Sequence, residues 1–96
     1  MSMLIVELTY LKPLEEVDKV LQAHRAFLQT CYDKGLFLAS GPKNPRTGGI
    51  IIALTDQKTM KTLIEQDPFH QAGVAEYKIT EFEPVKRHEV LDGILS

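Results

Sequence analysis

The strongest constraint on the fold comes from residues 14–34, where apolar side chains recur with the period of an α-helix. At about 100° per residue they form one continuous stripe. The stripe consists of Leu14, Val17, Val20, Leu21, Phe27, Leu28, Cys31 and Tyr32. The opposite face carries Glu15, Asp18, Lys19, Gln22, Arg25, Gln29 and Asp33. A long helix that is apolar on one side is expected to lie on a sheet.

His24 interrupts this stripe near its centre. An imidazole that points into the protein needs a partner, because leaving a buried polar group unpaired costs about 1–3 kcal/mol. The spacing allows two interpretations. His24 is either a core histidine bonded to a backbone carbonyl or a site residue beside a cavity.

Four further segments are rich in apolar and β-branched residues and predict strands, over residues 3–10, 36–40, 49–55 and 76–85. Residues 41–48 have turn chemistry throughout and predict an open hairpin loop. A second helix is expected from Thr55 or Asp56 to about Gln66. A short helical turn follows, which begins at Pro68 and ends at Gly73.

The resulting order, β-α-β-β-α-β, predicts an α+β fold of the ferredoxin-like type, with a four-stranded antiparallel sheet and both helices on one face. Ninety-six residues suit one domain. Residues 1–85 would form its core and residues 86–96 a mostly polar C-terminal arm.

The third predicted strand is apolar at successive positions, Ile50-Ile51-Ile52-Ala53-Leu54. A strand with one exposed face should alternate, whereas a strand buried on both faces need not. We therefore expect a second copy of the chain to cover the free face of the sheet. The expected assembly is a homodimer, with the C-terminal arm as a candidate clasp.

Composition narrows the function classes. The net charge of −2 gives no basic surface for nucleic acid. Cys31 is the single cysteine, which excludes an internal disulfide and predicts an inert core residue. Neither a signal peptide nor a membrane span is apparent, so a cytoplasmic protein is expected.

Cofactors and metals are not expected either. The turn after the first strand lacks the glycines of a phosphate-binding loop. His24, His70 and His88 do not have the local spacing of zinc ligands. We expect no chemical role for His88, in the arm.

Three separated polar residues are the candidate catalytic group: His24, Asp67 and Ser40. Asp67 precedes Pro68 at a helix break, so its carboxylate could face inward or could cap the short helix, and the two roles are compatible. A carboxylate beside a histidine fixes the imidazole tautomer and supports the imidazolium. Ser40 is either a strand residue or a hydrogen-bond donor to substrate. The sequence does not determine whether His24 and Asp67 meet.

Further residues are candidates for substrate binding: Gly41, Pro42, Arg46, Phe69 and His70. Arg46, with Lys43 on the same loop, could hold a carboxylate or phenolate, or both could be solvated loop charges. Phe69 could equally belong to the core, and His70 to the surface.

Several short motifs occur in a fixed order along the chain: Gln22-Ala23-His24-Arg25, Leu38-Ala39-Ser40-Gly41-Pro42, Gly48-Gly49, Asp67-Pro68-Phe69 and Ala72-Gly73-Val74. In this series the chain resembles the YciI-like family of YCII-related domains, from the first strand to the fourth. The resemblance implies a dimeric α/β barrel of ferredoxin-like protomers. It also implies an active site at His24 and Asp67, with Ser40 close by.

Family members that are linked to a reaction act on small cyclic or aromatic catabolites, in eliminations of the dehydrochlorinase or muconolactone-isomerase kind. The short hairpin loop and the tail after Val85 depart from the family pattern. The substrate pocket therefore does not transfer from the family.

Two functions follow. In the first, the chain is a small-molecule enzyme without metal or nucleotide. His24 is its general base, Asp67 orients His24, and Ser40 with nearby backbone amides holds an oxyanion or hydroxyl. Its reaction would be elimination or isomerisation of a cyclic or aromatic acid. In the second, the chain is a non-catalytic homodimer that binds a small ligand or stabilises a partner, and the His24–Asp67 pair is structural.

Overall fold

A computed structural model describes residues 2–95 and has the predicted order of elements. The strands are β1 (Met3–Tyr10), β2 (Phe37–Pro42), β3 (Gly48–Ala53) and β4 (Ala75–Phe82). The helices of the core are α1 (Leu14–Lys19), α2 (Leu21–Asp33), α3 (Gln57–Gln66) and α4 (Pro68–Gln71). The α+β, ferredoxin-like prediction is confirmed.

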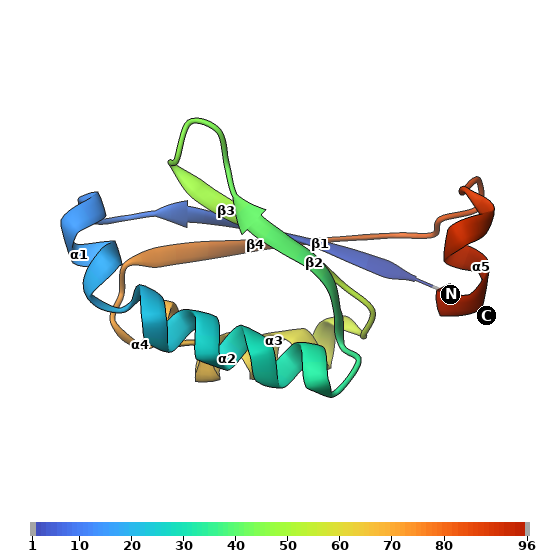
Figure 1. Cartoon of the computed structure of the whole chain (residues 1–96), viewed down its shortest axis with the longest axis horizontal. Coiled ribbons are helices and arrows are strands. Elements are labelled where there is room, and N and C mark those ends of the chain that lie inside the picture. The colour runs from blue at the N-terminus through green and yellow to red at the C-terminus, as the bar shows by residue number, and fades with distance from the viewer. Residues whose placement is uncertain (1, 96) are drawn as a thin grey trace.

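The four strands form one antiparallel sheet in the order β2-β3-β1-β4. Figure 1 shows α2, α3 and α4 along one face of this sheet. Within residues 2–95, no helix lies over the centre of the opposite face. We call these two surfaces the helix-covered face and the bare face.

The core lies between the sheet and the helices. On β1 the side chains of Leu4, Val6 and Leu8 are at most 2% exposed, whereas Ile5, between them, is only partly buried. Val6 pairs with Ile51 on β3, so Ile51 faces the same core. The alternation of burial along β1 follows from the pleat, which sends successive side chains to opposite faces.

The long helix predicted over residues 14–34 is two helices. The break is at Val20, whose backbone torsions of −114° and 7° lie outside the helical range. The amide of His24 donates to the carbonyl of Val20 at 2.9 Å, so the second helix begins its ladder directly after the break. Val17, His24 and Cys31 nevertheless remain buried, because both helices turn their apolar side to the sheet.

The hairpin is tighter than predicted, since the strands continue into the expected loop and leave only residues 43–47 between them. Gly48 makes this possible. A Cβ atom there would collide with the main-chain oxygen of Leu8, so only glycine permits β3 to pair this closely with β1.

A β-bulge in β2 decides which of its side chains face the helices. The register shifts between Phe37 and Ala39, so that Phe37 pairs with Ala53 while Ser40 pairs with Ile51. Ile51 and Ala53 are both buried in the core. Phe37 and Ser40 therefore share the helix-covered face although they are three residues apart, because a bulge reverses the alternation.

The C-terminal arm contains two short helical segments, η1 (Glu89–Leu91) and α5 (Asp92–Leu95). Arg87 and Asp92 form an ion pair at 2.9 Å, and Leu95 is buried. Figure 1 places α5 at the end of the molecule where the chain begins.

Candidate functional site

Asp67 lies at the junction of α3 and α4, in an extended conformation. The following Pro68 disfavours the helical conformation at this position and opens α4 as its first residue. Oδ1 of Asp67 accepts a hydrogen bond from the amide of Phe69 at 2.9 Å. Asp67 is thus a helix cap, and it is also a buried carboxylate with only 1% exposure.

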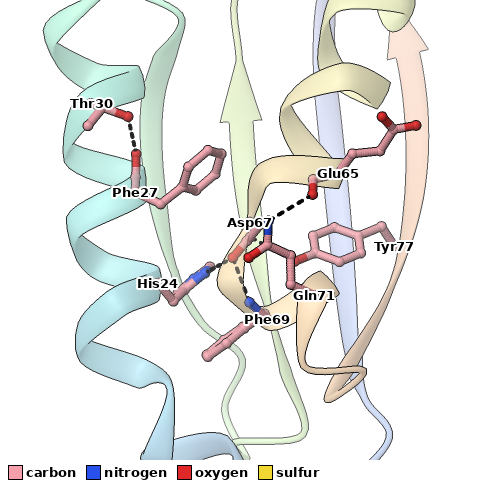
Figure 2. A network of polar contacts seen from close by, with 8 residues as sticks. All are labelled: His24, Phe27, Thr30, Glu65, Asp67, Phe69, Gln71 and Tyr77. Carbon is pink, nitrogen blue, oxygen red and sulfur yellow. Dashed lines mark hydrogen bonds and ion pairs between the residues drawn. The ribbon is translucent and has the colours of Figure 1, made fainter.

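His24 meets Asp67 from the facing helix, as Figure 2 shows. Nδ1 of His24 lies 2.7 Å from Oδ1 of Asp67. The Phe69 ring stacks on the imidazole, with ring centroids 3.7 Å apart and planes within 1° of parallel. The orientation of the His24 ring is therefore fixed by the Asp67 contact in the plane of the ring and by the Phe69 ring stacked on its face. His24 is 8% exposed.

The second oxygen of Asp67 has a partner of its own, since the hydroxyl of Tyr77 on β4 donates to Oδ2 at 2.7 Å. Burial, followed by the Asp67 charge, raises the pKa of Tyr77 well above its ordinary value, so this hydroxyl keeps its proton. With N–H and O–H groups donating to it, Asp67 serves as an acceptor. We therefore assign the hydrogen to Nδ1 of His24, and in the neutral imidazole this leaves Nε2 with its lone pair.

His24 lies on the wall of a cavity of about 510 Å³. The cavity is bounded by α2, the end of β1, the β2–β3 hairpin and α4. Its apolar lining includes Leu8, Leu21, Leu28 and Ile51, and its polar lining includes Tyr10, Arg25, Ser40 and Arg46. This volume is within the range of small-ligand pockets.

Most of the predicted site residues gather at this cavity. Ser40, Gly41 and Pro42 line it from β2, and Phe69 from α4. The hydroxyl oxygens of Ser40 and Tyr32 are 2.7 Å apart. The side chain of Ser40 therefore belongs to a hydroxyl pair at the cavity rather than to the bare face.

Arg46 also lines the cavity, but it is not a free loop charge. Its Nη2 atom pairs with Oδ1 of Asp18 at 2.6 Å, and its guanidinium carbon lies 5.8 Å from the ring centroid of Tyr10. Lys43, on the same loop, pairs with Glu7 at 2.8 Å and is not part of the lining.

His70 lies elsewhere. It is exposed on the far side of α4, and its ring makes an edge contact with Tyr77 at 5.9 Å between centroids. Both residues line a separate open groove beside α3 and β4. The structure thus separates His70 from the His24 cavity.

Two residues of the site were not identified from the sequence. Arg25 was assigned to the solvent face of its helix, yet it lines the cavity. Its position one residue after His24, close to Leu21 and Leu28 on the helix surface, is a signal that could have indicated this. Tyr77 gave no signal, because its contact with Asp67 depends on how closely α4 approaches β4.

Two features are absent from residues 2–95. In this part of the chain, no group of three or more His, Cys, Asp and Glu side chains is arranged to hold a metal ion. No helix among these residues has the length and apolar character needed to cross a membrane.

The chain also matches a known family of proteins. The family model of the YCII-related domain matches residues 3–83, and the chain belongs to this family. Among curated proteins, no relative matches the sequence significantly.

Solved structures with the same fold include two enzymes. A 5-chloro-2-hydroxyhydroquinone dehydrochlorinase from Burkholderia phenoliruptrix AC1100, in complex with 2,5-dihydroxybenzoquinone, superposes with a TM-score of 0.71 at 21% identity, over 86% of this chain and 94% of that one. SnoaB, a cofactor-independent oxygenase from Streptomyces nogalater, gives a TM-score of 0.52 at 13% identity, over 92% of this chain and 96% of that one. At these identities the likeness concerns the fold.

Proposed function

We propose that this protein is a small-molecule enzyme in which His24 is the general base, acting on a cyclic or aromatic acid by elimination or isomerisation. The observation that carries the proposal is the hydrogen bond between Nδ1 of His24 and the buried carboxylate of Asp67 at the wall of a cavity. This contact leaves the second ring nitrogen to act as the base.

In the proposed reaction, Nε2 of His24 takes a proton from a substrate carbon. The electron pair of the broken C–H bond then forms a new double bond. In an elimination it expels an anionic leaving group such as chloride, and in an isomerisation the proton returns at another carbon. Asp67 stabilises the imidazolium formed in the first step. The hydroxyl of Ser40, which lines the cavity and pairs with the hydroxyl of Tyr32, binds a substrate oxygen in this proposal.

The lining of the cavity favours an organic anion. Arg25 and Arg46 both border it, together with apolar side chains from β1, β3 and α2. Arg46 shares its charge with Asp18, so Arg25 is the stronger candidate for binding a carboxylate or phenolate. A planar ring with one anionic group suits this combination of charge and apolar wall.

Two further parts of the proposal concern assembly and location. Ile5 and Ile52 on the bare face are only partly buried within one chain. A second copy packed sheet to sheet would cover them, so we propose a homodimer. We also propose that the protein works in the cytoplasm.

The dehydrochlorinase of the same fold suggests the compounds for a test. The purified protein is titrated with 2,5-dihydroxybenzoquinone, and release of chloride from 5-chloro-2-hydroxyhydroquinone is measured. We expect binding, and turnover that falls by about 10²–10⁴-fold in His24→Gln while the fold is retained. His88→Gln is the matched control, since His88 lies in the C-terminal arm, and it should retain full activity.

The alternative function predicts a different result. If the buried pair is only structural, the wild type releases no chloride, whether or not it binds the quinone. His24→Gln then lowers the melting temperature and changes nothing else. That result would reject the enzyme and favour a structural His24–Asp67 pair.

A further inference from the structure

Tyr77 reaches Asp67 from the side opposite to His24. Figure 2 shows the two side chains approaching the carboxylate from different elements, α2 and β4. Tyr77 is not among the residues that line the His24 cavity and lies instead on the groove beside α3 and β4. Tyr77 can therefore affect a ligand in the cavity only indirectly, through its hydrogen bond to Asp67.

We propose that Tyr77 is a positioning residue for His24, because its hydroxyl holds Oδ2 of Asp67 and thereby sets how strongly Oδ1 attracts the N–H of His24. The consequence for turnover rests on the function proposed above. The hydrogen bonds themselves do not.

The argument depends on how a carboxylate distributes its charge. A donor at one oxygen stabilises the charged carboxylate and makes it a weaker base, so the bond that the other oxygen accepts becomes weaker. The effect is larger in a site with little water, and Asp67 is almost fully buried. Since the raised pKa of Tyr77 keeps its hydroxyl protonated, the donor is present throughout the neutral range.

The other charged or titratable groups near this chain of contacts do not replace Tyr77. The titratable side chains that line the groove with Tyr77 are Lys61, Glu65, His70 and Glu76. Within residues 2–95, the hydrogen bonds to the carboxylate oxygens of Asp67 come from His24, the Phe69 amide and Tyr77. Tyr77 is the donor that serves Oδ2.

The test is ¹⁵N and ¹H NMR of the ring N–H of His24 in the full chain, with the signal assigned by its loss in His24→Gln. In Tyr77→Phe the bond between Asp67 and His24 should strengthen, and the N–H proton resonance should move downfield. Thr30→Val is the matched control. It also removes a hydroxyl, one that bonds the carbonyl of Phe27 and does not contact Asp67, and it should leave the resonance in place.

A second substitution keeps the test decisive if Tyr77→Phe does not fold. Site-specific 3-fluorotyrosine at position 77 keeps the hydroxyl and makes it a stronger donor, so the His24 resonance should move upfield. Opposite shifts in the two proteins support the proposal. An unchanged resonance in a folded variant, or shifts of the same sign in both, would overturn it.

The kinetic measurement separates this inference from the proposed function. With 5-chloro-2-hydroxyhydroquinone, Tyr77→Phe should change kcat and leave KM as in the wild type, since Tyr77 does not line the cavity. An equal change in KM would overturn the assignment as a positioning residue. If the wild type shows no turnover but the resonances shift as expected, the proposed function fails and the role of Tyr77 stands.

Discussion

The two faces of the sheet differ in how their apolar side chains are covered. On the helix-covered face, Leu4, Val6 and Leu8 are closed in by the helices of the same chain. On the bare face, Ile5 and Ile52 stay partly exposed, and Glu7 pairs with Lys43. One face is complete within a single chain, whereas the other carries apolar side chains without a cover from residues 2–95.

This difference suggests that catalysis is to be sought on the helix-covered face and association with a second chain on the bare face. Within residues 2–95, each buried side-chain nitrogen or oxygen atom has a hydrogen-bond partner. On the helix-covered face His24, Asp67 and Tyr77 form a connected network. A network of that kind holds side chains in fixed orientations. The bare face has partly buried isoleucines at its centre, which is what a surface for a second sheet requires.

The largest expected effect is on the helix-covered face. Asp67→Ala should lower the free energy of unfolding by about 3–5 kcal/mol, because the partners of a buried carboxylate lose their acceptor. Asp56→Ala is the matched control. Asp56 caps α3 through the amide of Thr59 but is exposed, so its loss should cost about 1 kcal/mol. Urea denaturation measures both, and equal costs would mean that Asp67 is only a cap.

Neighbouring isoleucines on β3 compare the two faces directly. Ile51→Ala, in the core, should cost about 2–5 kcal/mol of unfolding free energy. Ile52→Lys, on the bare face, should instead shift the mass measured by light scattering from a dimer to a monomer. A wild-type protein that is monomeric at micromolar concentration would contradict the proposed homodimer.

A smaller expected effect is that the free energy of unfolding depends on pH differently for the two faces. The pKa of Tyr77 is raised by burial and by Asp67, so in the folded state Tyr77 holds its proton more tightly. Its contribution to stability is complete below the ordinary tyrosine pKa of about 10 and is lost as pH rises further, by about 1.4 kcal/mol per unit. Burial likewise raises the pKa of Cys31, which adds to the loss above its ordinary range.

The measurement is urea denaturation between about pH 8 and 11, the range in which tyrosine and cysteine side chains ordinarily lose their protons. Tyr77→Phe should flatten the decline above about pH 10, and the Cys31 part should remain. On the bare face, Lys43 lowers the pKa of Glu7, so the stability that this shift contributes is lost as pH falls through the acidic range. If the free energy of unfolding of Tyr77→Phe falls as steeply with pH as that of the wild type, Tyr77 is not the source of the decline.

Much of the fold could be predicted because strands, helices and their order are encoded locally. The period of the apolar stripe placed His24 inward, and Pro68 placed Asp67 at a break, so both halves of the pair were identifiable. Their contact was not, because it depends on how α2 and α4 pack. The break at Val20, the two side chains Arg25 and Tyr77, and the helical segments of the arm also depend on packing that a periodicity does not record.

The bulge in β2 bears on how this protein could change during evolution. It alone brings Ser40 to the cavity side, since regular alternation from Phe37 would have turned Ser40 outward. Deleting a single residue there would restore the alternation and exchange the side chains offered to a ligand, with no substitution in the cavity itself. Chain length at this strand, rather than residue identity, is therefore the simplest means by which relatives could acquire a different chemical preference.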